Sequence, residues 1–76
     1  MRKNIQAAWK AFCLGQHFTT SNGSLNVFTD RICSYDMPIV WRNADGTIEF
    51  MAGKAPSKTT ATHLNGMKEL FYKGSL

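Results

Sequence analysis

The sequence lacks the features that identify secreted, membrane-spanning and disulfide-stabilised proteins. It contains two cysteines, Cys13 and Cys33, so one disulfide is possible by number but no disulfide framework is implied. No apolar run approaches the length that crosses a membrane. The N-terminal stretch has neither the continuous apolar block nor the small-residue cleavage site of a signal peptide. We therefore expect a cytoplasmic protein with free thiols and no membrane partner.

Motifs for catalysis are missing as well, since the sequence has no glycine-rich phosphate loop, HExxH motif or paired carboxylates. Cys13, His17, Cys33 and His63 would make a Cys2His2 set, but their spacing matches no zinc signature. Cys33 lies in an apolar segment, where a thiol is more often buried than activated. For His63 we expect a hydrogen bond that fixes the connector Pro56 to Thr59, rather than a pH-sensitive contact at a binding surface. The sequence thus predicts a non-enzymatic protein with no metal and no cofactor.

Charge is not concentrated anywhere in the sequence. The 76 residues include nine Lys and Arg against five Asp and Glu, a formal net charge of +4, and no run of Lys or Arg exceeds two. This spread is typical of a solubilising surface. The modest positive balance favours acidic partners, either nucleic acid or an acidic protein surface. The length fits a single compact domain spanning residues 1–76.

What the sequence does contain is an alternating pattern between Ser24 and Met51. Apolar and polar residues alternate there and turn residues recur at hairpin intervals, which is typical of an antiparallel sheet with one face on a core. The expected strands are Leu25–Thr29, Ile32–Tyr35, Ile39–Arg42 and Thr47–Met51. Asp30-Arg31 is the expected tight turn, Met37-Pro38 marks a bend, bulge or edge, and Asn43 to Gly46 is a hairpin connection.

Helical periodicity flanks this stretch on both sides. Apolar residues within Asn4–Leu14 recur at i, i+3, i+4 and i+7, which predicts a helix that lies on the sheet. A second helix is expected to be capped by Thr59 or Thr60. Gly66 either weakens this helix or permits close packing on the first one. Phe18 either anchors a loop to the core or starts a short strand.

Together these elements predict an α+β fold. It consists of an N-terminal helix, a three- to four-stranded antiparallel β-meander and a C-terminal helix, with both helices on one sheet face. The expected core residues are Trp9, Phe12, Leu25, Val27, Ile32, Ile39, Trp41, Ile48, Phe50, Leu64, Met67 and Phe71.

Aromatic and basic residues are interleaved along the predicted strands. If Phe28 and Tyr35 point away from the helices, they are placed to stack on bases, with Arg31 and Arg42 on phosphates. Aromatic and Arg side chains are also the usual hot spots of protein interfaces. The candidate partner-binding residues are Phe28, Arg31, Tyr35, Arg42 and Tyr72. No catalytic or metal-binding residue is predicted.

Two short strings, Ser34 to Ile39 (SYDMPI) and Ser57 to Asn65 (SKTTATHLN), resemble a pattern in small, mostly uncharacterised bacteriophage proteins. In that pattern a Ser-Tyr strand leads to a Pro-Ile pair, and a Ser-x-Thr-Thr-Ser-x-His run opens a final helix. Here Ala61 replaces the last Ser, and Pro56 stands where an aromatic is usual. The resemblance spans Phe28 to Asn65. It implies a virus-encoded accessory protein and brings no known catalytic residues.

We therefore expect a small, phage-encoded binding protein in the cytoplasm of a bacterial host. It would inhibit or modulate a host protein complex, of defence or of transcription, by direct protein–protein binding. The alternative is a nucleic-acid-binding module that uses a basic and aromatic sheet face, with an affinity that falls steeply as salt rises. A third hypothesis is a homodimeric structural protein joined through a sheet edge after Pro38.

Overall fold

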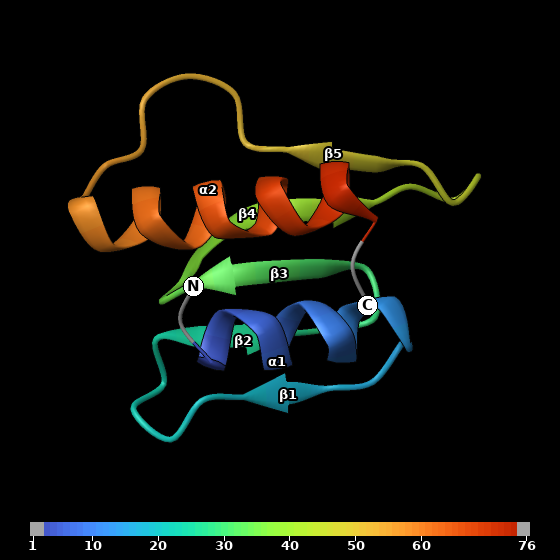
Figure 1. Ribbon diagram of the computed structural model, residues 1–76, viewed down its shortest axis with the longest axis horizontal. Helices are drawn as coiled ribbons and strands as arrows, with labels where there is room; N and C mark the ends of the chain where they lie inside the picture. Colours follow the sequence, from blue (N-terminus) through green and yellow to red (C-terminus); the bar gives the residue numbers. More distant parts are fainter. Residues whose placement is uncertain (1–2, 75–76) are drawn as a thin grey trace.

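A computed structural model describes residues 3–74 as an antiparallel sheet with one helix at each end of the chain (Figure 1). The helices are α1 (Lys3–Cys13) and α2 (Lys58–Lys73), and the strands are β1 (Phe18–Thr19), β2 (Leu25–Val27), β3 (Arg31–Ser34), β4 (Met37–Arg42) and β5 (Ile48–Phe50). The five strands pair in sequence order, each antiparallel to the next. The α+β meander is thus confirmed, with more strands than the three to four expected.

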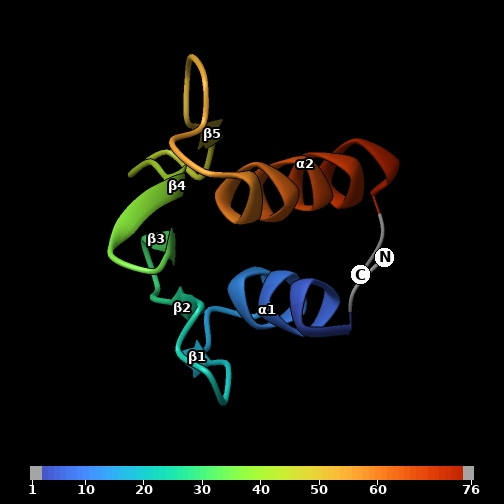
Figure 2. The ribbon, with the colours of Figure 1, turned by 90° about the vertical axis from the view of Figure 1, so that its left-hand side faces the viewer.

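Both helices lie on the same face of the sheet, side by side, as predicted (Figure 2). We call the covered face the inner face and the opposite one the outer face. No helix or strand from residues 3–74 lies over the outer face. The molecule therefore has two layers, and one side of its sheet meets solvent directly.

The strand β1 lies in a segment that the sequence leaves as a loop. Phe18 pairs with Val27 of β2, and its ring packs against the core. The two alternatives for Phe18 therefore both hold, because its ring anchors the segment while its backbone starts a short edge strand.

The two helices meet closely at Gly66. The predicted stripe of α1 is buried, and its members are Ile5, Ala8, Trp9 and Phe12. A Cβ atom added to Gly66 would lie 2.9 Å from Cγ2 of Ile5, which is closer than real non-bonded carbons approach. Close packing between the helices, one of the two expected roles of Gly66, is therefore confirmed.

A buried polar network joins the sheet to the start of α2. Ser57, not Thr59 or Thr60 as predicted, is the N-cap, since its Oγ accepts a hydrogen bond from the backbone N–H of Thr60 at 3.2 Å. Oγ of Ser34 on β3 lies 3.1 Å from Thr60 Oγ1 and 2.8 Å from His63 Nδ1. Ser34, Thr60 and His63 are all buried. His63 therefore helps to hold the sheet against α2 through Ser34, a contact that the sequence does not predict.

A β-bulge in β4 changes which side chains face the core. Val40 and Pro38 pair with consecutive residues of β3, which leaves Ile39 between them without a partner. Pro38 has no N–H to give to a ladder, and a bulge is where a strand accommodates it. Ile39 and Val40 are both buried, and the alternation restarts so that Trp41 faces outward. The prediction that Trp41 shares a face with Ile39 is therefore wrong.

The rest of the predicted core is largely correct. The confirmed buried residues are Trp9, Phe12, Leu25, Val27, Ile32, Ile39, Leu64 and Met67. Ile48 and Phe50 are only partly buried, because β5 is an edge strand. Phe71 is 39% exposed, which is a further correction, since the last turn of α2 extends to the margin of the core.

Candidate functional site

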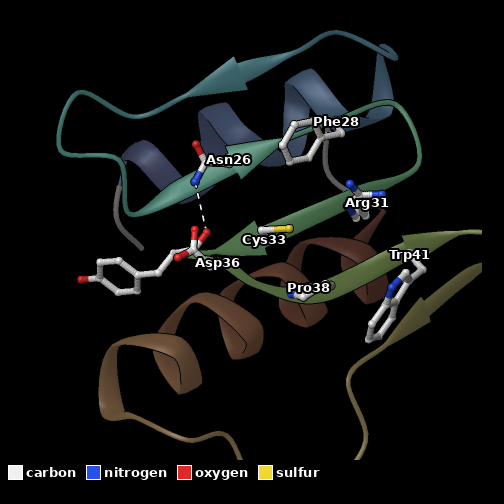
Figure 3. A pocket seen from close by; sticks show the side chains of 8 residues that line it. Asn26, Phe28, Arg31, Cys33, Asp36, Pro38 and Trp41 are labelled. Carbon is white, nitrogen blue, oxygen red and sulfur yellow. Dashed lines mark hydrogen bonds between the residues drawn. The ribbon is translucent and has the colours of Figure 1, made fainter.

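An open hollow of about 610 Å³ lies on the outer face over β2, β3 and β4 (Figure 3). Its lining residues are Asn26, Phe28, Arg31, Cys33, Tyr35, Asp36, Pro38 and Trp41. Asn26, Cys33 and Pro38 are cross-strand neighbours on β2, β3 and β4. Their small side chains cross the middle of the hollow. The bulky Phe28 and Trp41 stand at one end (Figure 3), and Tyr35, which follows β3 in the turn to β4, lies at the other. The hollow thus has a low floor between raised aromatic ends.

One raised end is built by the β2–β3 hairpin. The backbone N–H of Phe28 donates to the carbonyl of Arg31 at 2.8 Å, so Thr29 and Asp30 form the turn, one residue earlier than predicted. Because Phe28 and Arg31 face each other, the guanidinium lies 5.0 Å from the centre of the phenyl ring. The same guanidinium makes a 3.3 Å ion pair with Asp30. On its other side, the Phe28 ring is packed edge-on by the ring of His17. Arg31 is thus held in place by its neighbours.

The other raised end is the β3–β4 turn. Ser34 pairs with Met37, so Tyr35 and Asp36 are the two central residues of the turn. Tyr35 has a φ of +57°, a conformation that two-residue hairpins usually reserve for Gly, Asn or Asp. The amide of Asn26 donates a 3.2 Å hydrogen bond to the Tyr35 carbonyl and steadies this turn. A 52% exposed aromatic ring is therefore displayed on a strained backbone.

The tip of this hairpin also borders a second concave region. An open hollow of about 480 Å³ lies between the turn and the start of α2, with Met37 and Pro56 in its lining. Tyr35 lines both hollows. A partner that covered the β3–β4 turn would therefore contact this ring from either side.

Arg42, a predicted site residue, is placed elsewhere. Its guanidinium donates to the carbonyls of Phe12, at the end of α1, and of Thr29, the latter at 2.6 Å. It also lies 4.1 Å from the centre of the Phe12 ring. Arg42 therefore clamps the last turn of α1 to the β2–β3 turn and does not line the outer hollow.

Tyr72, the remaining predicted site residue, belongs to an aromatic cluster at the end of α2. Its ring lies 5.4 Å from that of Phe71 and 6.3 Å from that of Phe50, and Trp9 contacts the same group from α1. Tyr72 is 75% exposed. The five candidates therefore divide: Phe28, Arg31 and Tyr35 line one hollow, whereas Arg42 and Tyr72 lie apart from it.

Sequence reasoning left five lining residues out of the predicted site, namely Asn26, Cys33, Asp36, Pro38 and Trp41. Asn26 was detectable, because strict alternation places it opposite the apolar positions of β2. Asp36 follows Tyr35 in a turn whose position the sequence indicates only loosely. Trp41 was assigned to the core, and only the position of the bulge at Ile39 moves it to the outer face.

The two cysteines are free and lie on different elements. Cys13 ends α1 and is exposed, and Cys33 lies at the floor of the outer hollow. Partial burial raises the pKa of the Cys13 thiol above its usual value, and the positive charge of Arg42 opposes this rise. Within residues 3–74, no three His, Cys, Asp or Glu side chains gather as a metal site would require. Neither helix in that part of the chain is long and apolar enough to cross a bilayer.

Comparisons with protein-family models, with curated proteins and with solved structures find no match to this chain.

Proposed function

We propose that this protein is a small non-enzymatic binder that captures a partner protein on the outer face of its sheet. The observation that carries the proposal is the contrast in coverage. The inner face is buried under two helices, whereas on the outer face Phe28 and Trp41 are only partly buried and Tyr35 is exposed. Tyr, Trp and Arg grouped around a concave surface are the usual anchors of a protein interface.

The proposed setting is a bacterial host. The resemblance of Ser34 to Ile39 and Ser57 to Asn65 to small bacteriophage proteins supports a virus-encoded accessory protein acting in the host cytoplasm. A chain of 76 residues is suited to act as a stoichiometric inhibitor or modulator. The proposed targets are host complexes of defence or of transcription.

The position of Arg42 favours a protein over a nucleic acid as the partner. The nucleic-acid hypothesis assigns phosphate contacts to Arg31 and Arg42 beside the stacked aromatic rings. Arg42 instead bonds backbone carbonyls behind the hollow, and Arg31 is paired with Asp30. As far as residues 3–74 form it, the outer face therefore offers stacking rings without the row of unpaired cations that a phosphate backbone requires.

The burial of the nucleophiles supports a non-enzymatic role. Ser34 and His63 lie within hydrogen-bond distance, but each is only 1% exposed, so a substrate has no access to them. Cys33 is 7% exposed and lies at the floor of the hollow, between its aromatic ends. We interpret the first pair as structural and the thiol as part of the floor.

A capture experiment with matched tyrosine variants tests the proposal. Tagged protein is used to capture partners from bacterial lysate, with and without nuclease, and the bound proteins are identified by mass spectrometry. Tyr35→Ala removes an exposed ring from the outer hollow, and Tyr72→Ala removes one from the end of α2. We expect one stoichiometric protein that survives nuclease, is lost with Tyr35→Ala and is retained with Tyr72→Ala.

Each other outcome points to a different function. Capture that disappears after nuclease would support the nucleic-acid hypothesis. Capture that depends on Tyr72 and not on Tyr35 would move the interface to the aromatic cluster. If the captured protein is a second copy of the chain, light scattering at two concentrations should show a dimer, which would support the homodimer hypothesis.

A further inference from the structure

The acidic residues of the chain are distributed unevenly around the outer hollow. Three carboxylates border it: Asp30 lies in the β2–β3 turn, Asp36 in the β3–β4 turn, and Glu49 opposite Trp41 on β5. Among residues 3–74, Arg31 is the one cation in the lining of the hollow, where the Asp36 carboxylate numerically balances its charge. Around the lining, Asp30 and Glu49 add two carboxylates and Arg42, bonded to the β2–β3 turn, adds one cation, so the border of the hollow carries more carboxylates than cations although the formal charge of the chain is +4.

Two of these carboxylates have no cationic partner within residues 3–74. Arg31 pairs with Asp30 at 3.3 Å, which matches one positive to one negative charge. Glu49 accepts a 2.9 Å hydrogen bond from the Asn43 side chain, a neutral donor. Neither Asp36 nor Glu49 takes part in an ion pair in the described part of the chain. The uncompensated charges therefore belong to Asp36 and Glu49.

These two carboxylates bracket the hollow. Asp36 lies in the β3–β4 turn beside Tyr35, at one end, and Glu49 on β5 is the cross-strand neighbour of Trp41, to the side of the other end. Cross-strand partners lie on the same face, so Glu49 shares the outer face with Trp41. The two carboxylates thus lie near opposite ends of the hollow, each next to an aromatic residue.

From this arrangement we propose that the outer hollow recognises a basic segment of its protein partner. An apolar side chain of the segment lies over the floor, and Lys or Arg residues on either side of it meet Asp36 and Glu49. This inference rests on the proposed function and specifies its partner. A neutral or acidic segment would desolvate both carboxylates without compensation, whereas a basic one pairs them. The conclusion reverses the preference for acidic partners that the overall charge suggests.

Selection from a random peptide library tests the inference without knowledge of the natural partner. The library is selected on immobilised wild-type protein and, in parallel, on the charge-reversed variant Asp36→Lys/Glu49→Lys. Both positions are exposed, so the variant should fold, which circular dichroism checks. We expect peptides rich in Lys and Arg around an apolar residue from the wild type, and peptides rich in Asp and Glu from the variant.

Two matched glutamates then measure the effect. Glu49→Gln and Glu69→Gln each remove one exposed negative charge, the first beside the hollow and the second on α2. For the tightest basic peptide, Glu49→Gln should weaken binding by about two- to fivefold, the usual range for an exposed ion pair. Glu69→Gln should leave the dissociation constant unchanged.

The possible failures are distinguishable. If peptides bind in a Tyr35-dependent way but carry no excess of Lys and Arg, this inference is wrong and the proposed binding face stands. If no peptide depends on Tyr35, both the inference and the proposed face are wrong. A single-stranded oligonucleotide that binds more tightly than the basic peptides would overturn both in favour of the nucleic-acid hypothesis.

Discussion

The inner and outer faces of the sheet are made by the same strands but differ in what holds their side chains. Leu25, Val27, Ile32 and Val40 of the inner face are at most 2% exposed and are fixed by contact with the helices. The outer side chains are fixed by local devices instead: a cation over a ring, an ion pair and a side-chain amide on a turn carbonyl. The inner face therefore depends on burial, whereas the outer face is ordered while it remains exposed.

The largest expected effect is a difference in the free energy of unfolding between a variant of the inner face and a variant of the outer face. Ile32→Ala removes a fully buried side chain from the inner face and should lower the free energy of unfolding by about 2–4 kcal/mol. Phe28→Ala, on the outer face, should lower it by about 1 kcal/mol or less. Urea unfolding followed by circular dichroism measures both.

If Ile32→Ala does not fold, Ile32→Val replaces it, with an expected loss of about 0.5–1.5 kcal/mol. Equal losses from the inner and the outer substitution would mean that the outer face is covered by something in solution. That result would point to self-association of the chain.

The next effect compares two arginines. Arg42→Met removes charged hydrogen bonds to the carbonyls of Phe12 and Thr29 and should destabilise by about 1.5–3 kcal/mol. Arg31→Met breaks an exposed ion pair and should change stability by less than about 1 kcal/mol. Thermal unfolding should therefore distinguish the two variants clearly.

Partner binding should respond in the opposite order. Arg31→Met alters the outer hollow and should weaken capture of the partner, whereas folded Arg42→Met should retain it. Loss of capture with Arg42→Met alone, in protein shown to be folded, would return Arg42 to the site that the sequence predicts.

These arginines also show how far the sequence determines the structure. The helical stripe of α1 follows from the spacing of apolar residues, which no later part of the chain alters. The face of Trp41 and the direction of Arg42 depend on whether one residue of β4 is skipped by the pairing. Met37-Pro38 indicates a possible bulge, but alternation after it has two solutions that only packing distinguishes.

Only part of the candidate site could be predicted from the sequence, again because of the bulge in β4. Phe28, Arg31 and Tyr35 precede the bulge, and the structure gathers them as the alternating pattern suggests. The φ of Tyr35 carries no signal in the sequence, because a positive φ is usually read from Gly, Asn or Asp. The position of Glu49 at the border of the outer hollow depends on the register between β4 and β5, which brings Glu49 beside Trp41.

A smaller effect tests whether the outer face gives up stability to display its aromatic ring. Tyr35→Ala removes the ring but keeps the cost of a positive φ, and Tyr35→Gly removes both. The glycine variant should be more stable than the alanine variant by about 1 kcal/mol, while both lose the partner. Chemical denaturation beside the capture assay gives both readouts. Equal stability of the two variants would show that the turn is unstrained and that the exposed ring carries no cost in stability.

The smallest effect concerns the turn that brings β5 and its Glu49 to the rim of the outer face. The Asp45 carboxylate accepts hydrogen bonds from the backbone N–H and the hydroxyl of Thr47, at 3.0 and 2.7 Å, and these bonds hold the pKa of Asp45 below its usual value. A carboxyl whose pKa is lower in the folded state stabilises the fold at a pH above its unfolded pKa of about 3.9, and this contribution fades as the pH falls through the folded pKa. Asp45→Ala should therefore be slightly less stable than wild type at neutral pH, and the difference should shrink in strong acid. Urea midpoints for both proteins, measured across this pH range, give the comparison. A difference that persists unchanged in acid would mean that the Asp45 side chain supports the turn, and with it the position of Glu49 beside Trp41, independently of its charge.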